Sequence, residues 1–227
     1  MAGFNQAFRS IIPESVVGST AGARFETFGL ALEQKLSTGT YLGIEGQLLN
    51  STVNQTIGAV DLDFPPRFVA SSTRQNLDYQ EQDFIATMNQ LLGECWSLGA
   101  RYELSQVELQ TSYPDIPSSV TSANYAKNDA TLHEVSLFAL FNHPSGFFAR
   151  AEGNWYSQNN WGYQPALAGD DFWQVNLFAG YRFWRRHGQI QMGVLNLAGQ
   201  DYHLNPLNLY TDLPRERTFT VSLELSF

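Results

Sequence analysis

Serine, histidine and carboxylate side chains are the groups in this sequence that could perform hydrolysis if they met in one site. The histidines are His133, His143, His187 and His203. No serine lies in a G-x-S-x-G segment, and no spacing places a histidine predictably beside a serine nucleophile. A hydrolase stays an alternative without a motif behind it. We expect a protein that is not an enzyme and has no catalytic residue and no cofactor.

Metal chemistry has no spacing signature either, because the sequence has no C-x-x-C or H-E-x-x-H segment. Carboxylates in two predicted long loops could hold a hard cation, but their spacing is not that of an EF-hand. These residues are Asp61, Asp63, Asp78, Asp170 and Asp171. We expect no metal site. The single cysteine, Cys95, cannot form an internal disulfide and is predicted to lie unpaired in a turn.

The composition limits the partners of this 227-residue chain, whose net charge is -9 and whose pI is about 4.8. Nucleic acid requires clustered Lys and Arg, so we expect no such partner. The mean hydropathy is -0.24, and the sequence has no apolar run of about 18 residues that could form a transmembrane helix. Alternating strands keep the average hydropathy low even in lipid, so a membrane β-barrel stays compatible with these values.

The elements that would position these side chains are strands. Residues 217–227 alternate polar and apolar, with Phe219, Val221 and Leu223 among the apolar set, so the two faces of this strand meet different surroundings. The same period predicts about nine strands, longer than is typical of soluble sheets. They are predicted at 24–36, 40–54, 81–92, 97–111, 130–142, 147–158, 171–184, 188–198 and 216–227.

The predicted connections alternate in length along the chain. Short turns are expected at 37–40, 93–96, 143–146 and 185–188, and long loops at 55–80, 112–129, 159–170 and 199–215. Short periplasmic turns and long external loops on opposite ends are typical of an antiparallel outer-membrane barrel. We therefore predict an all-β fold, an antiparallel transmembrane β-barrel of about nine to ten long strands in the bacterial outer membrane, with its lipid as a partner.

Alternation places one set of charged residues on the inward, lumen-lining side of this predicted barrel. The set is Glu45, Arg101, Glu103, Glu134, Arg150, Glu152, Arg182 and Glu224. These side chains could line a substrate path. Alternatively, they pair across neighbouring strands or dock a further domain and so keep a wet wall satisfied.

Aromatic residues at the strand ends favour a membrane barrel over a soluble β-sandwich. They form a predicted interfacial girdle beside the short turns, made of Tyr41, Trp96, Phe141, Phe147, Phe183 and Trp184. Tyr156, Trp161 and Tyr163 are predicted in or beside an external loop. Because aromatic rings stack on ligand rings, these three are candidate ligand contacts.

Strand parity predicts that the chain is the C-terminal portion of a larger barrel. The last strand should end on the periplasmic side, which puts residues 1–23 in an external loop. An open sheet would leave unpaired edges in lipid, so further strands are expected before Met1. We treat residues 1–227 as a single barrel region without a plug domain. The start has no secretory signal.

The C-terminal segments resemble those of TonB-dependent outer-membrane receptors. The resemblance rests on residues 194–202 (Val-Leu-Asn-Leu-Ala-Gly-Gln-Asp-Tyr), on Pro214 to Phe219 and on a last strand ending at Phe227. It implies a larger barrel with an N-terminal plug and a TonB-type energy transducer as partners. It also implies that Phe227 is a membrane-assembly signal for the barrel-assembly machinery.

Two functions follow from these expectations. The first is TonB-dependent receptor-like import of a scarce solute such as a siderophore or an oligosaccharide, with this chain forming barrel wall and external loops. The alternative is a self-contained, small porin-like barrel that conducts small solutes.

Overall fold

The chain is all-β, as predicted. The computed structural model describes residues 24–63, 67–183, 187–204 and 214–226, and these form nine strands and a short 3-10 helix, η2 (Ser122–Asn124). The strands are β1 (Arg24–Lys35), β2 (Thr40–Asp63), β3 (Arg67–Leu92), β4 (Trp96–Ser112), β5 (Tyr125–Asn142), β6 (Phe147–Trp161), β7 (Asp170–Phe183), β8 (Gly188–Leu195) and β9 (Thr218–Leu225). Among these residues no helix has the length and apolarity needed to cross a membrane.

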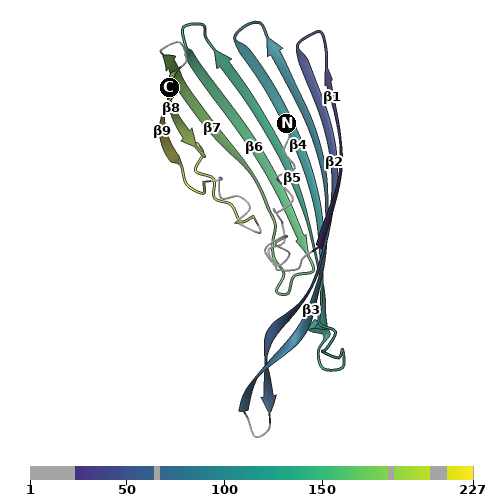
Figure 1. Cartoon of the computed structure of the whole chain (residues 1–227). Helices are drawn as coiled ribbons and strands as arrows, with labels where there is room; N and C mark the ends of the chain where they lie inside the picture. Colours follow the sequence, from purple (N-terminus) through teal and green to yellow (C-terminus); the bar gives the residue numbers. More distant parts are fainter. Residues whose placement is uncertain (1–23, 64–66, 184–186, 205–213, 227) are drawn as a thin grey trace.

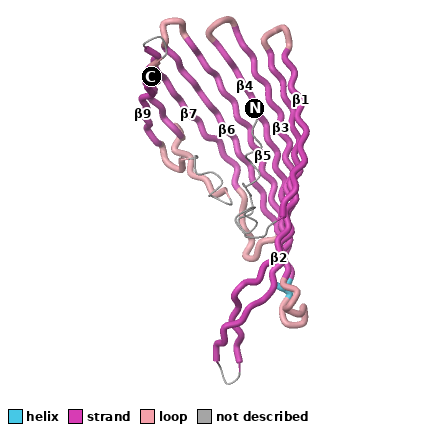
Figure 2. Tube along the Cα trace, in the orientation of Figure 1, coloured by secondary structure: helices cyan, strands magenta, loops and turns pink. Residues whose placement is uncertain are grey.

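All nine strands belong to one antiparallel sheet in which each strand pairs with its neighbours in sequence. Among the described residues β1 and β9 do not pair with each other, so the sheet is open, as Figure 1 and Figure 2 show. In a sheet of alternating direction with an odd number of strands, the first and last strands point the same way. Residues 1–23 and Phe227, for which an external loop and an assembly signal were predicted, lie outside the described residues.

The turns at 37–40, 93–96 and 143–146 lie at one end of the sheet, as predicted (Figure 1). The fourth predicted turn, 185–188, includes residues that lie outside the described ones. Glycines with positive φ occupy the first three turns: Gly39 (76°), Gly93 (60°) and Gly146 (102°). At Gly146 a side chain is also excluded by space, because a Cβ would lie 2.3 Å from the Arg182 carbonyl oxygen. Cys95 is a free thiol in the turn between β3 and β4, again as predicted.

Residues 55–80 are not the predicted loop but part of the longest hairpin. β2 and β3 stay paired from Thr40↔Gln90 to Asp63↔Arg67, whereas β1 reaches only Thr52 and β4 only Asn76. Beyond these points the two strands form a free two-stranded arm, residues 54–63 and 67–75, which projects opposite the short turns (Figure 1). The arm was missed because neither of its faces packs on a core, so it lacks an apolar period of 2.

Register divides the sheet into two faces. We name each face for its part near the short turns. "The apolar face" carries the exposed residues Leu98, Leu137, Leu177, Met192 and Val221, and "the polar face" is the opposite one. Neighbouring residues in each strand alternate between the two. The hydrophobic core of buried residues lies on the polar face, far from the short turns, and is made of Leu49, Val53, Leu77, Tyr79, Val107, Leu109, Ala130, Leu132, Tyr156 and Phe172, together with Tyr202 and Leu204 from the segment after β8.

Candidate functional site

The eight charged residues predicted to line a lumen share the polar face. Glu45 is opposite Ile85, Ile85 is opposite Glu103, and Glu103 is opposite Glu134. The pairing continues through β6, β7 and β8 to Glu224, which is opposite Gln189. The structure thus brings the whole set together on one surface near the short turns.

Several of these charges are paired with one another. Arg101 Nη1 lies 2.6 Å from Glu103 Oε2 and 3.8 Å from Glu134 Oε1. One guanidinium therefore contacts carboxylates of both β4 and β5. Arg150 Nη2 lies 2.8 Å from Glu152 Oε1. Such pairs give the charged groups of the polar face partners within the sheet. This is the structural role that the sequence analysis considered for them.

Arg182 connects three strands near the turns. Its Nε donates to Gln189 Oε1 (3.0 Å) and its Nη1 donates to Asn142 Oδ1 (2.7 Å). The guanidinium also lies 4.3 Å from the centre of the Phe148 ring. Hydrogen bonds and ring contact together hold this cation in place, so Arg182 ties β5, β7 and β8 on the polar face.

The alternation of apolar and polar side chains reverses along β4. On the apolar face Leu98, Ala100, Tyr102 and Leu104 are followed by Gln106, Glu108 and Gln110, which are polar. On the polar face the order is the opposite, because Arg101, Glu103 and Ser105 are followed by the buried Val107 and Leu109. The environment of both faces therefore changes near residue 105.

The same reversal occurs in register in three neighbouring strands. On β2 the apolar face changes from Ile44 and Leu48 to Asn50 and Thr52. On β3 it changes from Met88 and Phe84 to Gln82 and Gln80. On β5 it changes from Leu137 and Val135 to Thr131 and Asp129. Leu48 pairs with Gln82, Gln82 with Gln106, and Gln106 with Thr131. We call this row of paired residues the reversal line.

Aromatic rings mark both limits of the apolar part of the apolar face. Near the turns, the Trp96 and Phe141 ring centres are 4.8 Å apart, and those of Phe141 and Phe147 are 6.3 Å apart. Of the predicted girdle, Trp184 lies outside the described residues.

A second aromatic row lies near the reversal line and was not predicted as a row. Ring centres are 6.2 Å apart from Tyr102 to His133, 6.5 Å from His133 to Trp155, and 6.5 Å from Trp155 to Trp173. Tyr102 Oη lies 2.9 Å from His133 Nδ1, and Trp155 Nε1 donates to Asp171 Oδ1 at 2.8 Å. Rings with one polar and one apolar side suit a boundary between two environments.

The segment after β8 is fastened to the polar face by Asn196, which is fully buried and has a φ of 49°. Its Nδ2 donates to the carbonyl oxygens of Gln200, Pro214 and Arg215 at 2.8, 3.0 and 3.1 Å, and its Oδ1 accepts from the Gln200 amide at 2.8 Å. Its backbone amide donates to Asn176 Oδ1 at 2.9 Å. The Asn196 side chain thus joins Gln200 to Pro214 and Arg215, and its backbone amide attaches the segment to β7.

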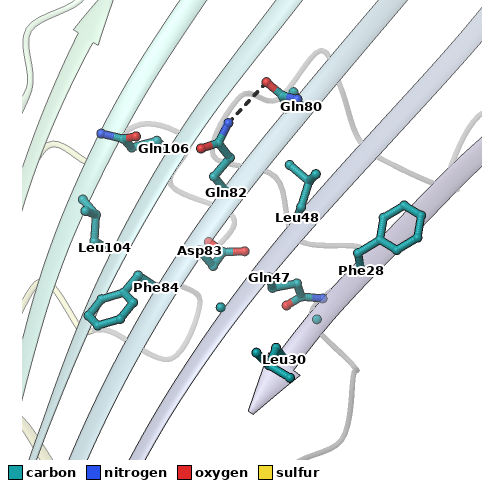
Figure 3. Close-up of a pocket in the computed structure, with 12 residues that line it drawn as sticks. Phe28, Leu30, Gln47, Leu48, Gln80, Gln82, Asp83, Phe84, Leu104 and Gln106 are labelled. Carbon is teal, nitrogen blue, oxygen red and sulfur yellow. Dashed lines mark hydrogen bonds between the residues drawn. The ribbon is translucent and has the colours of Figure 1, made fainter. Parts of the chain in front are cut away.

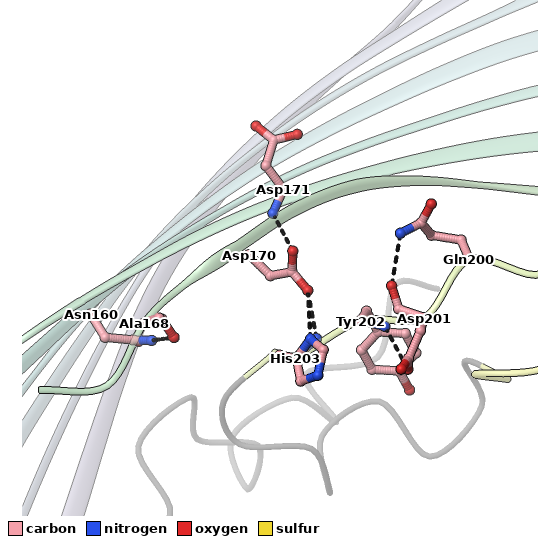
Figure 4. Close-up of polar contacts among 8 residues, drawn as sticks. All are labelled: Asn160, Ala168, Asp170, Asp171, Gln200, Asp201, Tyr202 and His203. Carbon is pink, nitrogen blue, oxygen red and sulfur yellow. Dashed lines mark hydrogen bonds and ion pairs between the residues drawn. The ribbon is translucent and has the colours of Figure 1, made fainter. Parts of the chain in front are cut away.

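Tyr202 then completes a stack of rings. Phe172 lies between Tyr156, 5.3 Å away, and Tyr202, 5.1 Å away, and the Arg215 guanidinium lies 5.2 Å from the Tyr202 ring centre. Figure 4 shows the adjacent hydrogen bonds of the Asp170 carboxylate. Its Oδ2 accepts from the His203 backbone amide at 2.5 Å, and its Oδ1 accepts from the Asp171 backbone amide at 2.8 Å. These contacts pack the segment against the polar face of the sheet.

The three aromatic ligand candidates are not gathered in one loop. Tyr156 belongs to β6 and is only 5% exposed, because it packs in the ring stack. Trp161 ends the same strand and is 53% exposed on the apolar-face side. Tyr163 follows in the connection to β7.

A histidine and a serine are in contact in the turn between β5 and β6. His143 Nδ1 lies 2.8 Å from Ser145 Oγ, a contact that sequence spacing did not predict. Ser145 N also donates to this ring nitrogen (3.2 Å), so the pair caps an exposed tight turn. In the part of the chain that the structure describes, no three His, Cys, Asp or Glu side chains are grouped to hold a metal ion.

The arm is attached at its base to the loop between β4 and β5. Arg74 Nη2 lies 2.5 Å from Asp115 Oδ1, and the Arg74 backbone amide donates to Asp115 Oδ2 at 3.0 Å. Gln75 Nε2 adds a bond to Tyr113 Oη at 3.0 Å. The direction of the arm is therefore set by contacts of Arg74 and Gln75.

No protein-family model matches this sequence, and no curated protein matches it either.

Replacing Asn196 with Asp is expected to lower the free energy of unfolding by about 2–4 kcal/mol, because three buried carbonyls lose a donor and a charge is buried. Asn196→Gly keeps the backbone unstrained at this φ and should also destabilise. Denaturant unfolding in detergent would measure both. The control is the exposed Asn159→Asp on β6, expected to change stability by less than about 0.5 kcal/mol; equal effects at both sites would contradict the role of Asn196.

Arg74 holds the pKa of Asp115 below its ordinary value, chiefly through side-chain hydrogen bonds and then through the backbone amide and charge. A lowered folded-state pKa means that the contact stabilises the protein above the unfolded pKa and is lost as pH falls through the lowered value. We expect Arg74→Gln to raise the pKa of Asp115 toward its ordinary value. An NMR titration of the Asp115 carboxyl would measure this change. Arg67→Gln, at the arm tip, is the control and should leave it unchanged.

Proposed function

We propose that the chain forms part of the wall of an outer-membrane β-barrel, with the apolar face toward lipid. The observation that carries this proposal is the reversal of alternation at one register line in four adjacent strands. A soluble sheet has the same solvent along the whole of each face, so its pattern has no reason to reverse. A strand that leaves lipid for water must exchange apolar for polar residues on its outer face, and it can then build an ordinary apolar core inside.

The height of the apolar part supports this placement. Phe147 and Trp155, which belong to the two aromatic rows, are eight residues apart on β6. This separation corresponds to about 27 Å along the strand and to about 20 Å across a membrane at the usual barrel tilt. Tyr181 and Trp173 have the same spacing on β7. The apolar band of a membrane barrel is about 25 Å tall.

The open edges support a larger barrel. Because β1 and β9 point the same way, direct closure would join them in parallel. A closed antiparallel barrel therefore needs an odd number of further strands between these edges, and lipid does not tolerate the unpaired backbone groups of an open edge.

Within such a barrel the function that we propose is TonB-dependent receptor-like import of a scarce solute, without chemistry on that solute. The support is the resemblance of residues 194–202 and 214–227 to the ending of those receptors, together with a charged polar face. The ion pairs of Arg101 and Arg150 favour a structural role for these two residues over ligand contact.

A charge on the apolar face tests the lipid contact. Met192 is 58% exposed on this face, and its neighbour Gln191 lies on the polar face of the same strand. In liposomes, Met192→Arg is expected to lower the free energy of unfolding by about 1–3 kcal/mol, because Met192 lies between the aromatic row near the turns and the middle of the apolar part. Gln191→Arg should lower it much less. If the face met water, Met192→Arg would change stability by less than about 0.5 kcal/mol, and the placement would be wrong.

Conductance tests whether the chain is a complete pore. We expect residues 1–227, refolded in detergent and added to a planar bilayer, to associate and to give no steady current, because their edges are open. Chain added without refolding is the control. A stable monomer with steady conductance would support the porin-like alternative and would overturn the proposal of a receptor wall.

A further inference from the structure

A shallow groove of about 650 Å³ crosses the apolar face over β1–β4 (Figure 3). Its lining includes Phe28 and Leu30 from β1, Leu48 from β2, Phe84 from β3 and Leu104 from β4. Leu30, Phe84 and Leu104 come from the apolar side of the reversal line, whereas Leu48 belongs to the line and Phe28 pairs with it. The lining also includes Gln82 and Gln106, which belong to the line, and Gln80, which lies beyond it. The groove therefore passes from an apolar end to an amide end formed by β3 and β4.

Gly46 makes this depression in the face. It lies between Leu30 on one strand and Phe84 on the other, and a Cβ built on it would have no atom within 4 Å. The flanking side chains project, since Leu30 is 81% exposed and Phe28 is 63% exposed. A straight apolar chain fits such a trough and would contact both of its walls.

The amide end can form hydrogen bonds but carries no charge. Gln82 Nε2 donates to Gln80 Oε1 at 3.4 Å, and Gln80 Nε2 donates to Asn50 Oδ1 at 3.1 Å. Glu108, the next charged residue on β4, is 2.8 Å from Lys127 and is thus neutralised. The one ionisable residue of the lining, Asp83, belongs to the polar face, where Ser105 donates to it at 2.5 Å.

We propose that this groove binds one membrane lipid, with an acyl chain over Gly46 and the uncharged glycerol ester region against Gln82 and Gln106. The order of the lining matches the order of groups in a diacyl lipid: hydrocarbon first and then ester carbonyls, which accept hydrogen bonds from amides. The lack of a cation in the lining argues against capture through the phosphate. This proposal rests on the lipid placement proposed above.

The test uses the full chain in liposomes that contain phosphatidylcholine with a photoactivatable group on one acyl chain. Cross-linked peptides are mapped by mass spectrometry. We expect cross-links to the groove residues to exceed those to the apolar face of β6 and β7 by about threefold, a preference of about 0.65 kcal/mol. Gly46→Leu fills the trough and should remove the excess.

The matched control is Gly153→Leu, because Gly153 also lies on the apolar face but a Cβ built on it would lie 3.8 Å from Trp173 Cζ3. It should leave the excess unchanged. The double variant Gln82→Ala with Gln106→Ala keeps the trough open and should also lower the yield. It serves as the second test if Gly46→Leu does not fold.

Three results would overturn the proposal. Equal cross-linking over the whole apolar face, unaffected by Gly46→Leu, would show bulk lipid only and would leave the membrane placement intact. Preferential capture of an anionic phosphatidylglycerol probe would contradict a site for the uncharged ester region. Absence of cross-links from the entire apolar face would remove the groove and the membrane placement together.

Discussion

Backbone pairing in one continuous register is the constraint on which the other features depend. It aligns Leu48, Gln82, Gln106 and Thr131 in one row, so four independent sequence patterns reverse at the same level. It also gathers eight charged residues on one face and a hydrophobic core on the same face farther from the turns. A shift of one residue in any strand would exchange its two faces.

The charged and the apolar parts of the polar face serve different needs. Near the turns, Arg101 and Arg150 neutralise carboxylates beside them. Farther along, Tyr156, Phe172 and Tyr202 stack and bury one another, and Asn196 satisfies the carbonyls of the segment that brings Tyr202 there. The polar face is thus held by ion pairs near the turns and by packing farther from them.

The sequence predicted what depends on a period of 2 and missed what does not. The nine strands, the turns at Gly93 and Gly146 and the common face of the charged residues follow from alternation. The arm was taken for a loop because residues 55–61 do not belong to the hydrophobic core and so carry no apolar period of 2. Tyr156 was predicted in or beside an external loop. It lies beyond the reversal line, where the polar face carries buried aromatic residues, and the sequence alone does not distinguish such a residue from an exposed aromatic at a strand end. The contacts of Asn196 depend on residues from distant parts of the chain and have no local pattern.

The reversal line has a consequence for the vertical position of the protein. If the sheet lies in a membrane as proposed, sliding it along the membrane normal leaves each face toward the same side, so face alternation alone does not fix its depth. Under the proposed placement, sinking would draw Gln82 and Gln106 into hydrocarbon, and rising would lift Leu48 and Phe84 into water. Because the pattern reverses at the same level in four strands, all four oppose a change of depth in either direction.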